Sequence, residues 1–245
     1  VNYKMEVTFP KNKQRQHSKF PINTTNTIPF FSIPPMAAAI SEVQSNTPGD
    51  RLFLYDLFDS TVIVTVTASA KSVRKWISST LHLHRYWHRG GKMVAGLGVQ
   101  WTAGSYDHDA DILTICVGCR VLIFQIPHSQ TAPRLLRRFL ADESITFVGV
   151  WNHQDMKKLE NCHLYLEVHD ALDARMYVTD DDGEDLRSAG FERIVEECLG
   201  YSVVGRSKET SLSDWSVRRL SSKQVAYAAV DAYASFLIGR DYSAW

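Results

Sequence analysis

Residues 221–237 read SSKQVAYAAVDAYASFL, and this stretch contains the clearest helix signal in the sequence. Ser221 and Gln224 have the spacing of a capping box, which predicts that a helix begins there. Tyr227 and Asp231 are four residues apart, so they share one helix face, one turn apart. A carboxylate in that position can hold a divalent metal ion, and a phenol beside it can orient a water molecule for attack on a phosphodiester. The spacing alone is more typical of a surface aspartate beside a half-buried tyrosine.

A second stretch, residues 145–159, combines a short apolar strand with the start of a helix. The strand is predicted over 145–150, and Asn152 can cap the helix that follows it. Asp155 would then lie in the first helical turn, just beyond the end of a strand. An acid in that position also interacts favourably with the helix dipole, and the residues alone favour this ordinary interpretation.

The rest of the chain, outward from these stretches, contains further strands and helices. Residues 51–58 and 61–67 have the pattern of a hairpin, and a helical face follows over 73–84. The other expected elements are strands at 93–101, 112–117, 121–126 and near 165–168, a helix after Thr131, a helical stretch around 171–176, and a helix over 191–199 that ends at Gly200. Successive strands followed by alternating strands and helices predict an α/β fold, with a mixed sheet and flanking helices.

The composition is that of a globular protein with an uneven distribution of charge. The 245 residues include 27 Lys and Arg, 27 Asp and Glu, and 44% hydrophobic residues, and no apolar run is long enough to predict a membrane span. Residues 1–35 carry five basic residues and one acidic residue, so the rest of the chain has a net charge of −4. We expect 1–50 to be a disordered leader, with 1–35 a presequence or a segment upstream of a start at Met36, and 51–245 to be one domain. Because that domain is mildly acidic, nucleic acid would have to bind in a local groove.

Cysteine and histidine spacings give weaker signals. The four cysteines are too few for a disulfide scaffold, so free thiols in a reducing compartment are expected. Cys116 and Cys119 have a zinc-like spacing, but a single such pair favours a structural place in a hairpin. His84 and His88 are four residues apart without the glutamate of a zincin motif, which favours an exposed helix end.

Three segments together resemble the motifs of a known family. Residues 93–101 (MVAGLGVQW), 147–159 (FVGVWNHQDMKKL) and 212–236 (LSDWSVRRLSSKQVAYAAVDAYASF) are similar in order and spacing to the three motifs of the DEDDy 3′–5′ exonucleases, the group of ribonuclease D and Werner-type exonucleases. The sequences GLGVQW at 96–101 and IVEECLGY at 194–201 most resemble those of plant RISC-interacting clearing exoribonucleases. The resemblance covers roughly residues 55–240 and implies a ribonuclease H-like fold.

Carried over by position, the resemblance implies that Asp155 and Asp231 bind Mg²⁺ or Mn²⁺ and that Tyr227 positions the attacking water. The first motif departs from the family, because Gly98 and Gln100 stand where Asp-x-Glu is usual. A site for two divalent ions needs anionic oxygens on both ions. Four carboxylates would offset the charge of +4 on two such ions, and Asp155 and Asp231 supply only two. We therefore expect one weakly held ion. Candidate contacts to nucleic acid are Gln100, Trp101, Trp151, Lys157 and Lys158.

The resemblance implies a metal-dependent 3′–5′ exonuclease that acts on single-stranded nucleic acid, RNA in particular. It also implies Argonaute-type silencing complexes as partners, a ring-shaped homo-oligomer such as a hexamer, and a location in the cytoplasm or the nucleus, away from membranes. The missing carboxylates would come from a neighbouring chain or from Asp107, Asp109 and Asp111, although a solvated loop is the ordinary interpretation of those acids. The alternative is a catalytically inactive module that binds nucleic acid or protein.

Overall fold

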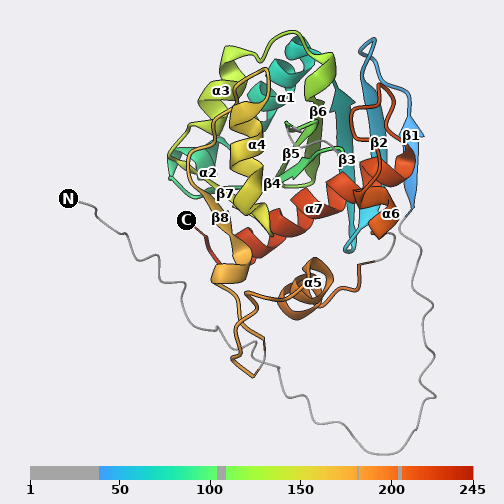
Figure 1. Ribbon diagram of the computed structural model, residues 1–245. Coiled ribbons are helices and arrows are strands. Elements are labelled where there is room, and N and C mark those ends of the chain that lie inside the picture. The colour runs from blue at the N-terminus through green and yellow to red at the C-terminus, as the bar shows by residue number, and fades with distance from the viewer. Residues whose placement is uncertain (1–38, 104–108, 181, 204–205, 245) are drawn as a thin grey trace, which may run out of the picture.

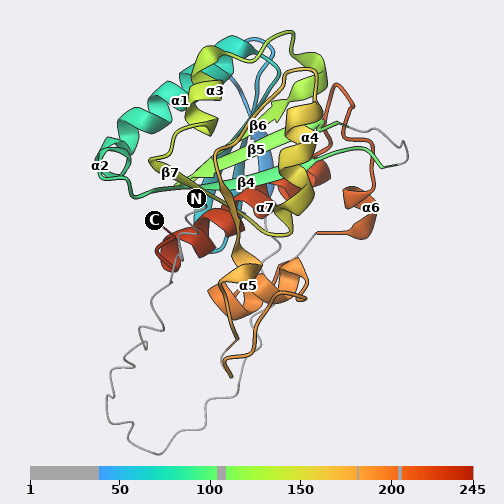
Figure 2. The same cartoon turned by 60° about the vertical axis from the view of Figure 1, so that its left-hand side comes forward.

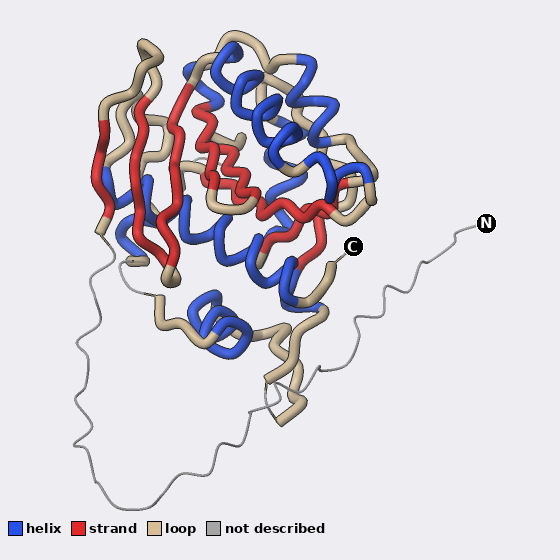
Figure 3. The backbone as a smooth tube through the Cα atoms, turned by 180° about the vertical axis from the view of Figure 1, so that it is seen from behind, coloured by secondary structure: helices blue, strands red, loops and turns tan. Residues whose placement is uncertain are grey.

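The computed structural model describes residues 39–103, 109–180, 182–203 and 206–244, and the expected presequence over 1–35 lies outside them. Within these residues the chain forms one eight-stranded sheet in the order β1-β2-β3-β6-β5-β4-β7-β8 (Figure 1). The strands are β1 Ile40–Val43, β2 Arg51–Leu57, β3 Ser60–Thr67, β4 Met93–Gln100, β5 Ile112–Val117, β6 Arg120–Gln125, β7 Ile145–Gly149 and β8 Ala171–Asp173. From behind, they form one twisted layer (Figure 3).

The strand directions bring the carboxyl ends of two strands, β4 and β7, to the same end of the sheet. β4, β5 and β6 are antiparallel neighbours, whereas β7 pairs in parallel with β4, and β8 in parallel with β7. The carboxyl ends of β4 and β7 therefore lie at one edge, where the chain leaves the sheet next to Trp101 and Val150. The mixed sheet with flanking helices predicted from the sequence is confirmed.

Helices cover both faces of this sheet (Figures 1 and 2). One core cluster joins a sheet face to α7 and α5, and the other joins the opposite face to α1, α3 and α4. The helices are α1 Ala70–Leu83, α2 Arg85–Arg89, α3 Arg134–Leu140, α4 Asp155–Asn161, α5 Phe191–Leu199, α6 Lys208–Ser211 and α7 Ser222–Asp241. The predicted capping box at the start of α7 is present: Gln224 N donates to Ser221 Oγ, and Ser221 N donates to Gln224 Oε1.

β4 is buried along its whole length, and its residues alternate between the two faces. Ala95, Leu97 and Val99 belong to the cluster beneath α1, α3 and α4, so the intervening residues face α7. Gly96 allows this helix to approach closely, because a Cβ built there would lie 1.9 Å from the carbonyl oxygen of Ala232. The close contact fixes the middle of α7 directly over the end of β4.

Three expected elements are corrected by the structure. β1 lies inside the range 1–50 expected to be a disordered leader; it pairs with β2, and Glu42 binds Arg51 at 2.8 Å. Residues 165–168 form no strand, since Leu166 N donates to the carbonyl of Leu159 at the preceding helix. The stretch expected to be helical around 171–176 instead begins with β8, which pairs with β7, and ends in a 3₁₀ turn over Ala174–Met176.

Among the described residues, no helix is both long enough and apolar enough to cross a lipid bilayer.

Candidate active site

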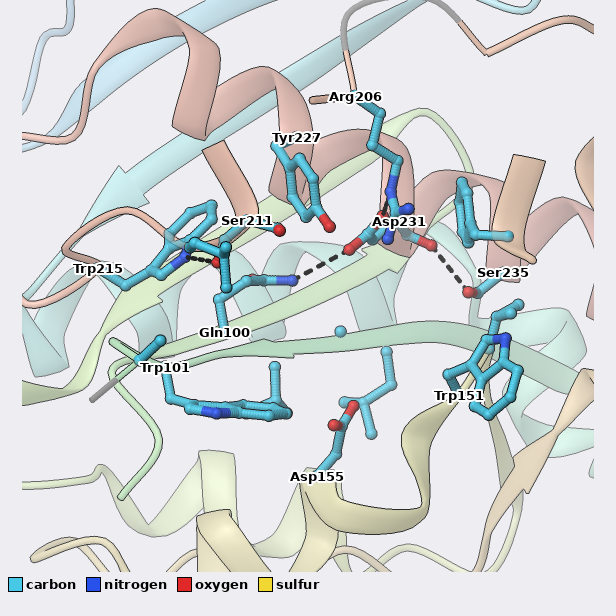
Figure 4. A pocket seen from close by; sticks show the side chains of 17 residues that line it. Gln100, Trp101, Trp151, Asp155, Arg206, Ser211, Trp215, Tyr227, Asp231 and Ser235 are labelled. Atoms are coloured by element: carbon cyan, nitrogen blue, oxygen red, sulfur yellow. Dashed lines mark hydrogen bonds and ion pairs between the residues drawn. The ribbon is translucent and has the colours of Figure 1, made fainter. Parts of the chain in front are cut away.

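A pocket of about 290 Å³ lies at the edge where β4 and β7 end. Its walls come from the end of β4, the start of α4, the middle of α7 and the segment that contains Arg206 (Figure 4). Asp155, Tyr227 and Asp231, which the sequence predicted to act together, all line it. Segments more than 70 residues apart along the chain therefore meet in one cavity at the carboxyl ends of the strands.

Asp231 is the most constrained carboxylate of the pocket. Its Oδ1 accepts a hydrogen bond from Arg206 Nε at 2.8 Å, and its Oδ2 accepts one from Gln100 Nε2 at 3.2 Å. Burial is the largest influence and raises the pKa of Asp231, while the neighbouring guanidinium lowers it. Both oxygens that could bind a metal ion are therefore occupied by side chains of the protein itself.

Arg206 is a charged residue of the pocket that the sequence did not reveal. Besides the ion pair with Asp231, its Nη1 lies 3.0 Å from Glu192, and its guanidinium lies 4.5 Å from the ring centre of Tyr227. Although burial opposes the charge, the Asp231 carboxylate raises the pKa of Arg206, so the side chain stays a cation. It belongs to the irregular segment 201–219, where no periodicity predicts which way a side chain points.

Asp155 enters the pocket from the opposite side of β4 to Asp231 (Figure 4). It begins α4, as predicted, and is 6% exposed. Burial, and after it the charges of Asp231 and Asp173, raise the pKa of Asp155 to about 8. This carboxyl group therefore holds its proton more tightly than an exposed aspartate does. The expected cap does not form: the Asn152 side chain donates to Leu172 O at 3.1 Å instead.

Tyr227 lies one turn before Asp231, and its hydroxyl points into the pocket (Figure 4). Its ring packs against Trp215 at 5.8 Å between centres, and the residue is 8% exposed. Burial and the nearby Asp231 charge raise the pKa of Tyr227 to about 12. The phenol is therefore neutral and can both donate and accept a hydrogen bond.

The predicted nucleic-acid contacts divide into two groups. Gln100, Trp101 and Trp151 line the pocket, and Trp151 presents a ring that is partly open to solvent. Lys158 lies at its margin, with Nζ 4.8 Å from the ring centre of Trp101. Lys157 is exposed on α4 and does not line the pocket, so the structure does not bring it to the site.

The acids proposed as replacement ligands do not join the pocket within the described part of the chain. Asp107 lies outside the described residues, and Asp109 is exposed. Asp111 accepts hydrogen bonds from the backbone N and the hydroxyl of Thr102, at 2.8 and 2.7 Å, which gives it a structural role. Asp173, another neighbour of the pocket that the sequence did not suggest, uses both oxygens to bind Arg175.

The acidic residues that line the pocket are too few to hold two divalent ions. Asp155 and Asp231 are the two carboxylates that line the pocket, and no group of three or more acidic, histidine or cysteine ligands occurs among the described residues. Gln100 adds a neutral oxygen: its Oε1 is buried without a hydrogen-bond partner. Buried acceptors without partners are rare, so this atom marks a place where a ligand or an ion would be favourable.

The weaker candidates have structural roles. Cys116 is buried at the end of β5, and its thiol donates to Gly118 O in the hairpin, as expected for a structural pair. His88 Nε2 lies 2.8 Å from Asp142, so this ring nitrogen has a carboxylate as its partner.

Other proteins are similar to this chain in sequence or in structure. A protein of Acanthamoeba polyphaga mimivirus, whose name describes an inferred 3′–5′ exonuclease, is 22% identical over 230 residues, which are 91% of this chain and 55% of the viral protein. Ribonuclease D of Escherichia coli superposes with a TM-score of 0.53 at 20% identity, over 67% of this chain and 42% of its own. The catalytic core of RRP6 from Trypanosoma brucei gives 0.57 at 12% identity, over 74% and 46%.

These comparisons confirm the predicted ribonuclease H-like fold. The chain spans about half the length of these relatives. The sequence profile of the 3′–5′ exonuclease family matches residues 102–240, more than half of the chain, and this range includes Asp155, Arg206, Tyr227 and Asp231. By this match the chain belongs to the 3′–5′ exonuclease family.

Proposed function

We propose that this protein is a 3′–5′ exonuclease that shortens single-stranded nucleic acid, with RNA as its substrate. The observation that carries the proposal is the convergence of Asp155, Tyr227 and Asp231, from two separate motifs, in one pocket at the sheet edge. RNA is favoured because the fold relatives include an Escherichia coli protein described as an exoribonuclease.

The side chains of the pocket have complementary roles in this proposal. Asp155 and Asp231 would hold one Mg²⁺ or Mn²⁺. When bound, this ion would stabilise negative charge on the phosphodiester. Tyr227, a neutral phenol that points into the cavity, would accept and donate hydrogen bonds to orient the attacking water. Trp101 and Trp151 offer rings for stacking of the terminal bases.

A second candidate function is a catalytically inactive module that binds the strand end without cleaving it. The ion pair between Arg206 and Asp231 favours this function, because a guanidinium already neutralises the carboxylate that a metal ion needs. Gly98 and Gln100 favour it as well, since the first motif contributes no charge to the pocket. A guanidinium can itself bind phosphate, so an inactive pocket would still recognise nucleic acid.

One assay separates the two functions. Single-stranded RNA and DNA labelled at the 5′ end are incubated with the purified protein in Mg²⁺, Mn²⁺ or EDTA. The enzyme produces a ladder of products that shorten from the 3′ end with metal and vanish with EDTA, and Asp231→Ala abolishes it. Asp241→Asn, which changes an exposed acid of the same helix, is the matched control. Strand binding without any ladder would establish the inactive module.

Assembly would complete the site in this proposal. We propose that the chain forms a ring-shaped homo-oligomer in which a neighbour supplies the missing carboxylates, and that it serves Argonaute-type silencing complexes in the cytoplasm or the nucleus. Light scattering tests the ring, since a monomer at every concentration contradicts it. Co-purification of tagged protein with Argonaute from cell extract tests the partner, with Asp241→Asn as a variant that should still bind.

A further inference from the structure

A second surface with the chemistry of a nucleic-acid site lies on α2, far from the pocket. This five-residue helix buries none of its side chains. Tyr86 is 79% exposed and Trp87 is 49% exposed, and the two rings meet edge to face with centres 5.6 Å apart. Two large aromatic rings held at a surface are unusual for a structural role alone, because they gain little from burial.

The same surface is strongly basic. Arg85, Arg89 and Lys92 are all exposed, and the sequence over 82–92 (HLHRYWHRGGK) contains no acidic residue. The domain as a whole is mildly acidic, so the charge of this surface is opposite in sign to the net charge of the domain. The α2 surface is defined here as Arg85, Tyr86, Trp87, Arg89 and Lys92.

The shape of this region suits an extended ligand. Trp87 and Lys92 stand between two hollows: one of about 780 Å³ bounded by Leu83 and the α2 residues, and one of about 300 Å³ that reaches Phe236 and Arg240 of α7. None of the residues that line either hollow is acidic. Arg240 also binds Asp241, at the outer margin of the second hollow.

We propose that the α2 surface binds single-stranded nucleic acid, with bases stacked on Tyr86 and Trp87 and phosphates held by Arg85, Arg89 and Lys92. Stacking on side chains requires bases that are not already stacked in a duplex, which selects single strands. The surface goes beyond the proposed function, since binding there needs neither the pocket nor a metal ion. It lies beyond the start of β4 (Figure 2), whereas the pocket is lined by residues at the end of that strand.

The charge distribution favours nucleic acid over a second copy of the chain. A symmetric contact would bring two surfaces of the same positive charge together, and like charges across an interface are costly. Phosphates, in contrast, are complementary to every charged residue of the α2 surface.

The test measures binding without cleavage. Fluorescence anisotropy with a labelled single-stranded RNA in EDTA gives Kd for the full chain and for two double variants. Tyr86→Ala with Trp87→Ala removes the stacking platform and is expected to raise Kd about tenfold or more. Arg85→Gln with Arg89→Gln is expected to weaken binding and to reduce the slope of log K against log salt by about 1.4, whereas the aromatic variant leaves the slope unchanged. Since α2 buries no side chain, both variants are expected to keep the thermal unfolding midpoint of the wild type.

Controls separate this proposal from the proposed function. Lys71→Gln with Lys75→Gln removes two exposed cations of α1 and should leave Kd unchanged. Asp231→Ala abolishes cleavage in the proposed function. Adding Tyr86→Ala and Trp87→Ala to it should still raise Kd for RNA. The proposal is overturned if both α2 variants bind RNA like the wild type. A second outcome also overturns it. In that outcome, light scattering shows that Trp87→Ala dissociates an oligomer, and the Kd for RNA per chain is unchanged.

Discussion

We predict that Arg206 limits the access of a metal ion to Asp231, because the two side chains form an ion pair. In Arg206→Gln the guanidinium is gone, so an Asp231 oxygen becomes available to an ion. We expect Mn²⁺ to raise the thermal unfolding midpoint of this variant by more than it raises that of the wild type, because an ion that binds only the folded state stabilises it. In EDTA the variant should unfold at a lower temperature than the wild type, since a buried carboxylate has lost its counter-charge. Arg193→Gln, which removes an exposed ion pair with Asp180, is the control; equal Mn²⁺ shifts in all three proteins would contradict this role.

The first motif offers a gain-of-function experiment. A Cβ at Gly98 would have its nearest neighbours at 3.6 Å, including Asp231 Cβ, which is an ordinary contact distance for the first atom of a side chain. Gly98→Asp with Gln100→Glu in the Arg206→Gln background restores the carboxylates usual for the family and removes the competing cation. We expect Mn²⁺ affinity, measured by calorimetry, to rise about tenfold or more over Arg206→Gln alone. A variant that folds but binds no more Mn²⁺ would show that these positions do not face the ion.

Asp155 should give the protein a distinctive pH dependence of stability. Its pKa is about 8 in the folded protein and 3.8 in the reference state, so the folded state binds the proton more tightly. The stability that this proton contributes is complete below pH 3.8 and is lost as the pH rises through about 8. Asp155→Asn keeps the shape and has no such proton. We expect the unfolding midpoint of the wild type to fall more across this range than that of the variant, by several degrees, since 1 kcal/mol corresponds to about 2–4 °C at this size. Parallel curves for the two proteins would contradict the raised pKa.

The three motif residues were predicted from the sequence through the order of the family motifs, because their local spacing alone favoured ordinary structural roles. Tyr227 and Asp231 are one helical turn apart, and Asp155 begins α4 six residues after the end of β7. Arg206 could not be predicted in this way. It is 25 residues from Asp231, in a segment without a repeating pattern, and only the folded chain brings the two together.

At the scale of elements, the contact between β4 and α7 holds the site in place. Gly96→Ala would place a methyl group against the backbone of α7, 1.9 Å from Ala232 O and 2.6 Å from Phe236 N, and backbone atoms cannot move aside as a side chain can. We expect a loss of about 3 kcal/mol or more of unfolding free energy in urea titration.

Gly98→Ala is the matched control two residues along the same strand and face. Its methyl group has room, so we expect the unfolding free energy to change by less than about 1 kcal/mol. A similar loss in both variants would mean that the helix does not pack as closely at Gly96 as the structure has it.

The long elements were predictable and the short ones were not. The helix of α7 and the strands β2 to β7 have clear patterns over five residues or more. β8 has three residues, and only its pairing with β7 defines it. Residues 165–168 have the composition of a strand, but the sequence cannot show that their backbone groups bind the preceding helix instead.

At the scale of the whole molecule, the described sheet includes residues before Arg51, the position at which the sequence predicted that the domain begins. A chain that starts at Arg51 lacks β1, and with it the Glu42–Arg51 ion pair and the packing of Ile40 on the core. We expect this truncation to lower the thermal unfolding midpoint by several degrees, whereas a chain that starts at Met36 keeps the midpoint of the full chain. Calorimetry of the three chains tests this; equal midpoints for the Arg51 and Met36 starts would mean that β1 contributes nothing to stability.

The two outermost strands of the sheet are its shortest. β1 has four residues and β8 has three, so the described sheet offers few free backbone N–H and C=O groups at either edge. Long, flat edges invite other chains to extend a sheet, and short ones discourage it. Self-assembly of this protein should therefore proceed through side-chain surfaces, and its concentrated solutions should resist conversion into fibrils by strand addition.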